Sequence, residues 1–127
     1  MNNILIIGCG LLGSSLLRRI HKKKVAKKIF IYEKSNSNIL KIKKLRLPCK
    51  VIDKIDKGVN NYDLIIISTP MSEYKNLILK INNFISPKTL ITDIGSSKIE
   101  TSKLIKKFLK KNISWTQSHP IAGSEVS

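Results

Sequence analysis

Short apolar runs alternate along this chain with longer stretches in which apolar residues recur every three or four positions. The short runs are rich in isoleucine, a composition that predicts β-strands. They lie at residues 4–7, 29–32, 49–52, 64–68, 90–92 and 113–116. The longer stretches have the spacing of one apolar helix face and predict α-helices. They cover about residues 11–23, 38–45, 74–85 and 97–111.

Individual residues indicate where two of the helices begin and end. Ser35 or Ser37 can cap the helix over about residues 38–45, and Pro48 is expected to close it. Pro87 is expected to stop the helix that follows the fourth strand, because proline cannot continue a helical hydrogen-bond pattern.

The elements follow one another as strand, helix, strand, helix, strand, and this series then repeats. Right-handed crossovers convert that order into an α/β fold, a doubly wound parallel sheet (Rossmann fold) of about six strands in the order 3-2-1-4-5-6. The run at 64–68 is the most continuously apolar, which predicts a central strand buried on both faces. We expect one domain over residues 1–127, with its ligand crevice beside the first strand.

A glycine-rich segment lies between the first predicted strand and the first predicted helix. The first glycine permits a tight turn, the second lets a pyrophosphate approach the backbone, and the third lets helix and strand pack closely. The helix N-terminus then offers N–H groups to the phosphates. A bare structural turn is the alternative interpretation. We expect the segment to bind a dinucleotide through Gly8, Gly10, Leu11, Leu12 and Gly13.

An acidic residue, Glu33, ends the second predicted strand. A carboxylate at this place accepts hydrogen bonds from the adenosine ribose hydroxyls and repels a 2′-phosphate. The sequence therefore predicts NAD as cofactor. NADP is not excluded, because the neighbouring Lys34 could pair with a 2′-phosphate.

Composition and cysteine usage narrow the class of protein. With 127 residues, of which 42% are hydrophobic, the chain suits one globular domain. No apolar run approaches the roughly 20 residues of a membrane span, and no leader is evident, so we expect a cytoplasmic protein without a membrane partner. Cys9 and Cys49 have neither metal-ligand nor disulfide spacing, so no metal site is expected.

The formal net charge of +16 raises the question of a nucleic-acid partner. The lysines fall mainly on the polar faces of predicted helices, and aromatic residues do not alternate with them as in single-strand binders. We therefore expect a solvated basic surface and no specific nucleic-acid partner. Its field would speed the encounter with a small anionic substrate.

Polar segments follow the fourth, fifth and sixth predicted strands, whose carboxyl ends should converge on the crevice. From the first two we expect cofactor contacts by Ser68, Thr69, Pro70, Asp93 and Gly95. Ser96 and His119 should lie together there, although Ser96 could be only a helix cap and His119 a loop residue. A neutral imidazole is a suitable base for an alcohol proton. The rival serine triad lacks a Gly-x-Ser-x-Gly elbow.

Taken together, these segments resemble the prephenate/arogenate dehydrogenase family in order and spacing, over the whole chain. The specific part is the combination of Asp-Ile-Gly-Ser-Ser-Lys at 93–98 with His-Pro-Ile-Ala-Gly-Ser-Glu at 119–125. The resemblance implies oxidative decarboxylation of prephenate or arogenate with hydride transfer to NAD(P), in tyrosine biosynthesis. It also implies that His119 deprotonates the ring hydroxyl, that Ser96 orients it, and that Ser124 and Glu125 border the substrate.

Members of that family have a further, helical domain that supplies the dimer interface and grips the substrate carboxylates. We expect that domain to be absent from this chain, the complete enzyme to be a homodimer, and these 127 residues alone to be inactive. Two alternatives remain at this point. One is a non-catalytic NAD-binding module, and the other is a dehydrogenase of the wider group acting on a hydroxy acid or an imine.

Overall fold

The computed structural model describes residues 1–8, 10–94 and 98–117. Its strands are β1 (Asn3–Ile7), β2 (Lys28–Tyr32), β3 (Lys50–Ile52), β4 (Leu64–Ile67), β5 (Leu90–Asp93) and β6 (Ser114–Gln117). Its α-helices are α1 (Leu11–Lys23), α2 (Asn36–Lys44), α3 (Tyr74–Asn82) and α4 (Lys98–Phe108). Two short 3₁₀ helices, η1 (Lys57–Asn61) and η2 (Met71–Glu73), flank β4.

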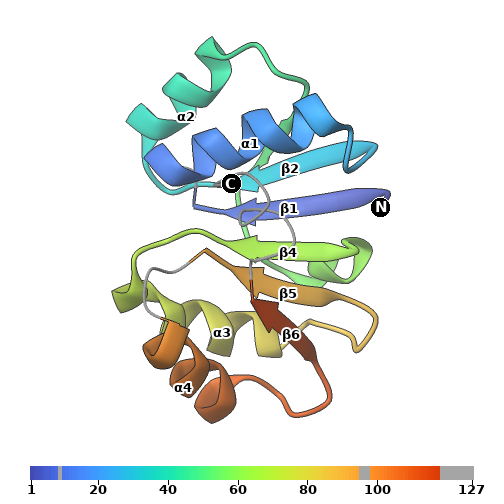
Figure 1. Ribbon diagram of the computed structural model, residues 1–127, viewed down its shortest axis with the longest axis vertical. Coiled ribbons are helices and arrows are strands. Elements are labelled where there is room, and N and C mark those ends of the chain that lie inside the picture. Colours follow the sequence, from blue (N-terminus) through green and yellow to red (C-terminus); the bar gives the residue numbers. More distant parts are fainter. Residues whose placement is uncertain (9, 95–97, 118–127) are drawn as a thin grey trace.

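The six strands form one parallel sheet in the order β3-β2-β1-β4-β5-β6, which confirms the predicted topology (Figure 1). Strand β1 lies between β2 and β4, and Ile7 at its carboxyl end is in register with Tyr32 and Ile67. The ends of these three strands therefore lie side by side at one edge of the sheet. The chain reverses its direction of winding at this place, which is where ligands bind in open α/β sheets.

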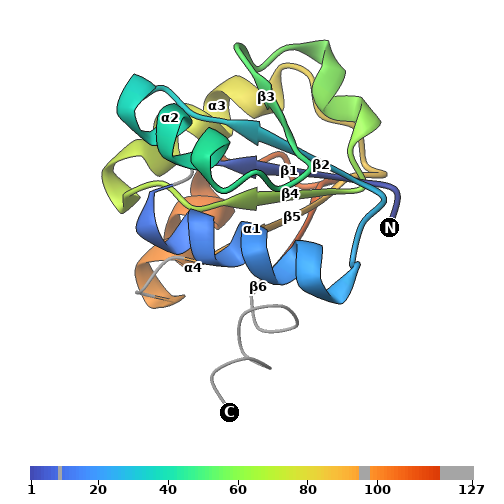
Figure 2. The ribbon, with the colours of Figure 1, turned by 90° about the horizontal axis from the view of Figure 1, so that it is seen from above.

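Helices cover both faces of the sheet, and Figure 2 shows α1 and α3 on opposite sides. Successive residues of β1 alternate between the two cores, as the pleat requires. Ile4 and Ile6 pack with α1 and α2, whereas Leu5 and Ile7 pack with α3 and α4. Strand β4 is buried at all four positions, which confirms the prediction of a central strand. Among the described residues, no helix has the length and apolar character needed to cross a bilayer.

The two prolines do not themselves end the helices that precede them. The side chain of Ser35 caps α2 by accepting the N–H of Asn38, and the helix stops at Lys44, where Arg46 takes a φ of +53°. Pro48 therefore does not close α2, because the left-handed residue has already turned the chain away. The predicted helix end near residue 45 is confirmed, whereas the closing role assigned to Pro48 was wrong.

Helix α3 stops at Asn82, before Ile85 and Pro87. The Asn82 side chain binds the end of α4, donating to the carbonyl of Phe108 and accepting from the N–H of Lys110 at 3.1 Å. Pro87 is thus not the stop signal of this helix, contrary to the prediction. Ile85 is nevertheless buried, as expected for the last apolar residue of the pattern.

A carboxylate ties the amino ends of β1 and β4 together. Asp63 accepts the backbone N–H groups of Asn2 and Asn3 at 2.8 and 3.0 Å. The hydrogen bonds from Asn3 and Asn2 favour the ionised carboxylate and hold the pKa of Asp63 below its usual range. The bonds align the two central strands at the end opposite to the candidate site.

Candidate cofactor site

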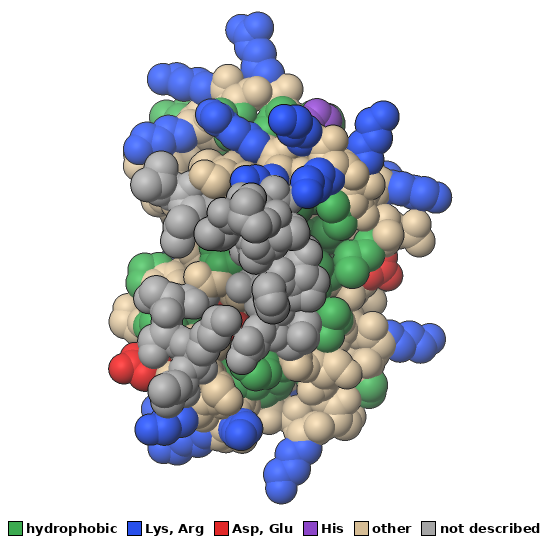
Figure 3. All heavy atoms as spheres, viewed as in Figure 1, with side chains coloured by type: hydrophobic (Ala, Val, Ile, Leu, Met, Phe, Trp, Pro, Cys, Tyr) green, Lys and Arg blue, Asp and Glu red, His purple; other side chains and the backbone are tan. Residues whose placement is uncertain are grey.

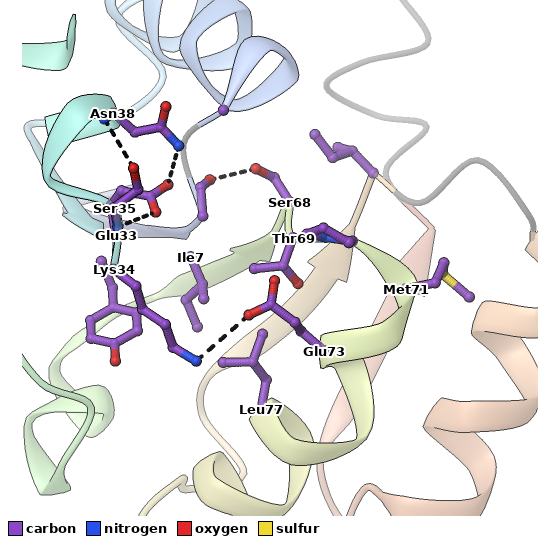
Figure 4. A pocket seen from close by; sticks show the side chains of 15 residues that line it. Ile7, Glu33, Lys34, Ser35, Asn38, Ser68, Thr69, Met71, Glu73 and Leu77 are labelled. Atoms are coloured by element: carbon purple, nitrogen blue, oxygen red, sulfur yellow. Dashed lines mark hydrogen bonds and ion pairs between the residues drawn. The ribbon is translucent and has the colours of Figure 1, made fainter.

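A cavity of about 710 Å³ opens at the carboxyl ends of β1, β2 and β4. Its walls come from the turn after β1, the segment between β2 and α2, and the segment between β4 and α3. Figure 4 shows the side chains that face it. Of the residues proposed from the sequence, the lining includes Gly8, Gly10, Glu33, Ser68, Thr69 and Pro70.

Gly8 forms the turn directly after β1. Its φ of +84° lies in the left-handed region, and a Cβ built on it would lie 2.6 Å from Cγ2 of Thr69. The N–H of Gly8 donates to the carbonyl of Tyr32 at 2.7 Å, and Ser68 Oγ donates to the carbonyl of Gly8. The turn is therefore held between the ends of β2 and β4, with no room for a side chain.

Gly10 is a glycine for a different reason. Its φ is −72°, which any residue can adopt, and no heavy atom lies within 4 Å of a Cβ built there. Packing among the described residues therefore does not require glycine at this position. A side chain at Gly10 would instead project into open space beside the cavity, where a pyrophosphate would need to approach the backbone.

Helix α1 begins at Leu11 and continues through Leu12 and Gly13, of which Gly13 is buried. Its N-cap residue, Gly10, contributes no capping side chain, and its first turn contains no acidic residue. The positive end of the helix dipole is therefore left uncompensated by side chains of this helix. Such a helix end suits an anion.

Glu33 follows β2 and turns towards the start of α2, as Figure 4 shows. Its carboxylate accepts the backbone N–H of Ser35 at 3.0 Å and the side-chain amide of Asn38 at 3.4 Å. These donors fix the carboxylate at the cavity wall. The structure thus places the predicted ribose acceptor beside the glycine turn, although 20 residues separate it from Gly13 in the sequence.

The end of β4 contributes a buried hydroxyl. Thr69 Oγ1 has no hydrogen-bond partner among the described residues, and Thr69 lines the cavity together with Ser68 and Pro70. A buried hydroxyl without a partner costs free energy, typically about 1–3 kcal/mol. A polar ligand in the cavity could satisfy it.

The cavity has one charged residue, Glu73, that the sequence analysis did not consider, and it pairs with Lys34. Lys34, from the β2 side, and Glu73, from η2, form an ion pair with Nζ and Oε1 3.6 Å apart. The pair was missed because 39 positions separate its members in the sequence (73 − 34 = 39). The sequence-level signal was the acid that follows Ser68-Thr69-Pro70 by three positions, just before a helical pattern.

Asp93 is placed differently from the other proposed cofactor contacts. Its side chain is 5% exposed, accepts Tyr74 Oη at 3.1 Å and Trp115 Nε1 at 3.2 Å, and is not in the cavity lining. The carboxylate thus joins β5, β6 and α3 from inside the core. Its proposed contact with the cofactor stays a prediction.

The remaining proposed residues, Gly95, Ser96, His119, Ser124 and Glu125, lie outside the described residues. The strands that lead to them are neighbours, as predicted, and Asp93 at the end of β5 is paired in register with Gln117 at the end of β6. The segments that carry Ser96 and His119 therefore start from adjacent points of the sheet edge. Their meeting at one substrate stays a prediction.

The part of the chain that the structure describes contains no group of three His, Cys, Asp or Glu side chains able to hold a metal ion. Burial raises the pKa of the Cys49 thiol, so its nucleophilic thiolate form is disfavoured.

Lys and Arg side chains project around the face shown in Figure 3, with few acidic ones between them. The rim of this face is therefore basic, as the composition predicts.

A parallel sheet of order 3-2-1-4-5-6, a glycine turn at the end of β1 and an acid at the end of β2 define a dinucleotide-binding Rossmann domain. The family model described as prephenate dehydrogenase, nucleotide-binding domain, matches residues 16–127. The chain belongs to this family.

Individual relatives agree with the family assignment. The chain is 33% identical to the prephenate dehydrogenase of Lactococcus lactis and 28% identical to that of Bacillus subtilis. These alignments cover 100% and 99% of this chain, and 36% and 34% of the relatives. The crystal structure of Aquifex aeolicus prephenate dehydrogenase with hydroxyphenyl propionate and NAD+ matches with a TM-score of 0.77 and 27% identity, over 97% of this chain and 43% of that one.

The chain spans about a third of the length of the curated relatives it matches. The family model begins at residue 16, after the glycine segment, whereas the alignment with the Lactococcus protein covers the whole chain. The glycine segment thus lies within the similarity to that relative.

Proposed function

We propose that this chain binds NAD in the cavity at the ends of β1, β2 and β4 and forms the cofactor-binding part of an enzyme that oxidatively decarboxylates prephenate or arogenate. The observation that carries the proposal is the open space beside Gly10 in the cavity lining. Packing among the described residues does not require a glycine at this position. The uncapped start of α1 and the fixed carboxylate of Glu33 support the same assignment. The similarity to an Aquifex enzyme solved with NAD+ adds support.

In this proposal each part of the cavity has a separate task. The first turn of α1 and the backbone at Gly8 and Gly10 hold the pyrophosphate, with Leu11, Leu12 and Gly13 contributing through the helix start. Glu33 binds the ribose hydroxyls. Bound NAD would accept the hydride that leaves the substrate. Ser68, Thr69 and Pro70 after β4 line the cavity and contact the cofactor there, and the proposal assigns further cofactor contacts to Asp93 and Gly95.

The proposed chemistry at the substrate needs a base and an orienting group. His119 takes the proton of the ring hydroxyl as the carbon that bears it loses hydride, and Ser96 holds that hydroxyl in place. Carbon dioxide leaves at the same time and the ring becomes aromatic, which supplies the driving force. Ser124 and Glu125 border the substrate. The substrate is anionic, and the basic surface would speed its arrival.

The proposal extends to the complete enzyme. It comprises residues 1–127 as the NAD(P)-binding domain and a helical domain that closes the substrate pocket and forms a homodimer. We propose a cytoplasmic enzyme without a specific nucleic-acid partner. The lysines of α1 and α2 that make the chain basic lie mostly at exposed positions, without interleaved aromatic side chains.

Cofactor choice tests the proposal directly. By titration, the purified chain should bind NAD at least about tenfold more tightly than NADP, because Glu33 repels a 2′-phosphate. Glu33→Ser should reduce this ratio to about threefold or less by removing the repulsion and the ribose acceptor. Equal or tighter binding of NADP by the unmodified chain would contradict the assignment.

A matched control separates specificity from folding, because Glu33 also accepts hydrogen bonds from residues at the start of α2. Ser35→Ala removes the N-cap of α2 and keeps the carboxylate. This variant should lose about 1 kcal/mol of stability and leave the ratio of NAD to NADP affinity unchanged.

Turnover by the chain alone tests the domain assignment. We expect no formation of NADH from prephenate and NAD above background, because the flexible exposed lysines of this chain are screened and cannot orient two substrate carboxylates. Clear turnover by the purified 127-residue chain, followed by absorbance, would show that these residues grip the substrate unaided. A non-catalytic NAD-binding module is distinguished by the lack of turnover in the complete protein as well.

A further inference from the structure

The ion pair between Lys34 and Glu73 spans the cavity. Lys34 comes from the segment after β2 and Glu73 from the segment after β4, and both line the cavity. Because β1 lies between β2 and β4, the pair reaches across the end of β1, on which the glycine turn sits. Figure 4 shows the two side chains extended towards each other above Leu77.

The charges on the cavity lining are few and unequal. Among the described residues, its charged members are Glu33, Lys34 and Glu73, which are two carboxylates and one ammonium group. Glu33 already has two donors from the start of α2, whereas Lys34 Nζ lies 3.6 Å from Glu73 Oε1. Lys34, the cation next to the proposed ribose acceptor Glu33, is therefore paired with the carboxylate of Glu73 on the opposite wall of the cavity.

A dinucleotide with a 2′-phosphate needs a cation at this place. In Rossmann domains that accept NADP, a basic residue near the end of β2 pairs with the added phosphate. Lys34 is the basic residue that the described part of the chain contributes to the cavity lining, and it directly follows Glu33. Whether Lys34 can pair with the 2′-phosphate depends on its present partner, Glu73.

We propose that Glu73 is a specificity-determining residue, because its pairing with Lys34 withholds the ammonium group from a ribose 2′-phosphate. Glu73 thereby disfavours NADP in addition to the repulsion from Glu33, and it does so from a different element, η2. The inference rests on the proposed function, since it requires a dinucleotide in the cavity.

The expected effect is moderate, because both side chains are partly exposed, at 69% for Lys34 and 39% for Glu73. An exposed ion pair is weak and screened by salt, but here two like charges also face a phosphate dianion. Glu73→Gln should tighten NADP binding about three- to tenfold and change NAD binding less than about twofold. The gain should shrink as the salt concentration rises towards about 1 M, where the Debye length falls to about 3 Å.

The experiment is a titration of NAD and NADP against four variants of the purified chain. Asp53→Asn is the matched control, because it removes one exposed carboxylate that does not line this cavity and changes the net charge equally. It should leave the ratio of the two affinities unchanged. Lys34→Met and the double variant Lys34→Met with Glu73→Gln complete the cycle. In the Lys34→Met background, Glu73→Gln should no longer tighten NADP binding.

Each outcome is decisive for Glu73. Selective tightening of NADP that depends on Lys34 supports the inference. No change, equal tightening of both cofactors, an equal effect of Asp53→Asn, or tightening that persists without Lys34 would overturn it. Failure of the proposed function gives a different result: the unmodified chain would bind neither NAD nor NADP. The four results that overturn the inference about Glu73 are obtained only if the chain binds at least one of the two cofactors.

Discussion

Aspartate in place of Gly10 should abolish measurable NAD binding, with a loss of at least about 100-fold, while the thermal midpoint stays the same or rises by a few degrees. NAD binding and thermal stability respond differently because Gly10 is the N-cap of α1 and also lines the cavity. Aspartate is a favourable N-cap and complements the helix dipole. The same carboxylate would occupy the open space beside Gly10 and repel the pyrophosphate.

Gly10→Asn is the matched control for charge, since it has nearly the same size and capping ability. It should keep the stability and weaken NAD binding less than Gly10→Asp does. Differential scanning fluorimetry and calorimetric titration measure the two quantities. Undiminished NAD binding by Gly10→Asp would show that the pyrophosphate does not approach this residue.

Gly8→Ala provides the contrast, because this glycine is required by the fold itself. Its φ of +84° and the 2.6 Å approach of Thr69 Cγ2 mean that a methyl group strains the turn and displaces the end of β4. We expect loss of about 1–3 kcal/mol of stability together with loss of binding. The pair of variants thus separates a structural glycine from one kept open for a ligand.

Replacing His119 by asparagine in a complete enzyme should lower kcat by about 10²-fold or more and leave the dissociation constant of NAD nearly unchanged. The imidazole is proposed to take the proton of the ring hydroxyl in the transition state, whereas asparagine can bond that hydroxyl but cannot take its proton. Steady-state kinetics with prephenate and NAD, with NAD titration alongside, measures both quantities.

The pH dependence of the same variant distinguishes a base from a packing residue. With a neutral histidine as base, kcat/KM of the unmodified enzyme should fall as the pH drops through the histidine pKa, ordinarily about 6.5. His119→Asn should remove that limb of the profile. A loss of thermal stability that matches the loss of activity, or an unchanged pH profile, would favour a packing role.

The fold was largely predictable from the spacing of apolar residues. Strand β4 illustrates why: a short run of four consecutive apolar, β-branched-rich residues, Leu64–Ile67, is typical of a strand covered on both faces. The alternation of strands and helices then determines the order of the sheet, because right-handed crossovers leave few alternatives. The helix ends were less predictable. At α2 a left-handed Arg46 ends the helix before Pro48, and α3 ends where Asn82 binds the end of α4.

In the candidate site, too, features that depend on local sequence were predictable, and features that depend on tertiary contacts were not. The glycine segment and Glu33 could be brought forward from the sequence as candidates for the cavity because their physical requirements are local: a turn, a helix start and an acid at a strand end. The ion pair between Lys34 and Glu73 could not, because it forms only when the chain brings the ends of β2 and β4 beside β1. Nor could the orientation of Asp93, which depends on the donors that Tyr74 and Trp115 present inside the core.

By itself, the sequence determined the class of fold, the position of the glycine turn after β1 and the presence of an acid at the end of β2, since each depends on neighbours within a few residues. Only the tertiary structure decided which of the two described loop glycines is required by packing, which carboxylate is buried in the core and which cation is engaged across the cavity. Those properties depend on distances between segments far apart in the chain. Such distances exist only once the sheet has assembled.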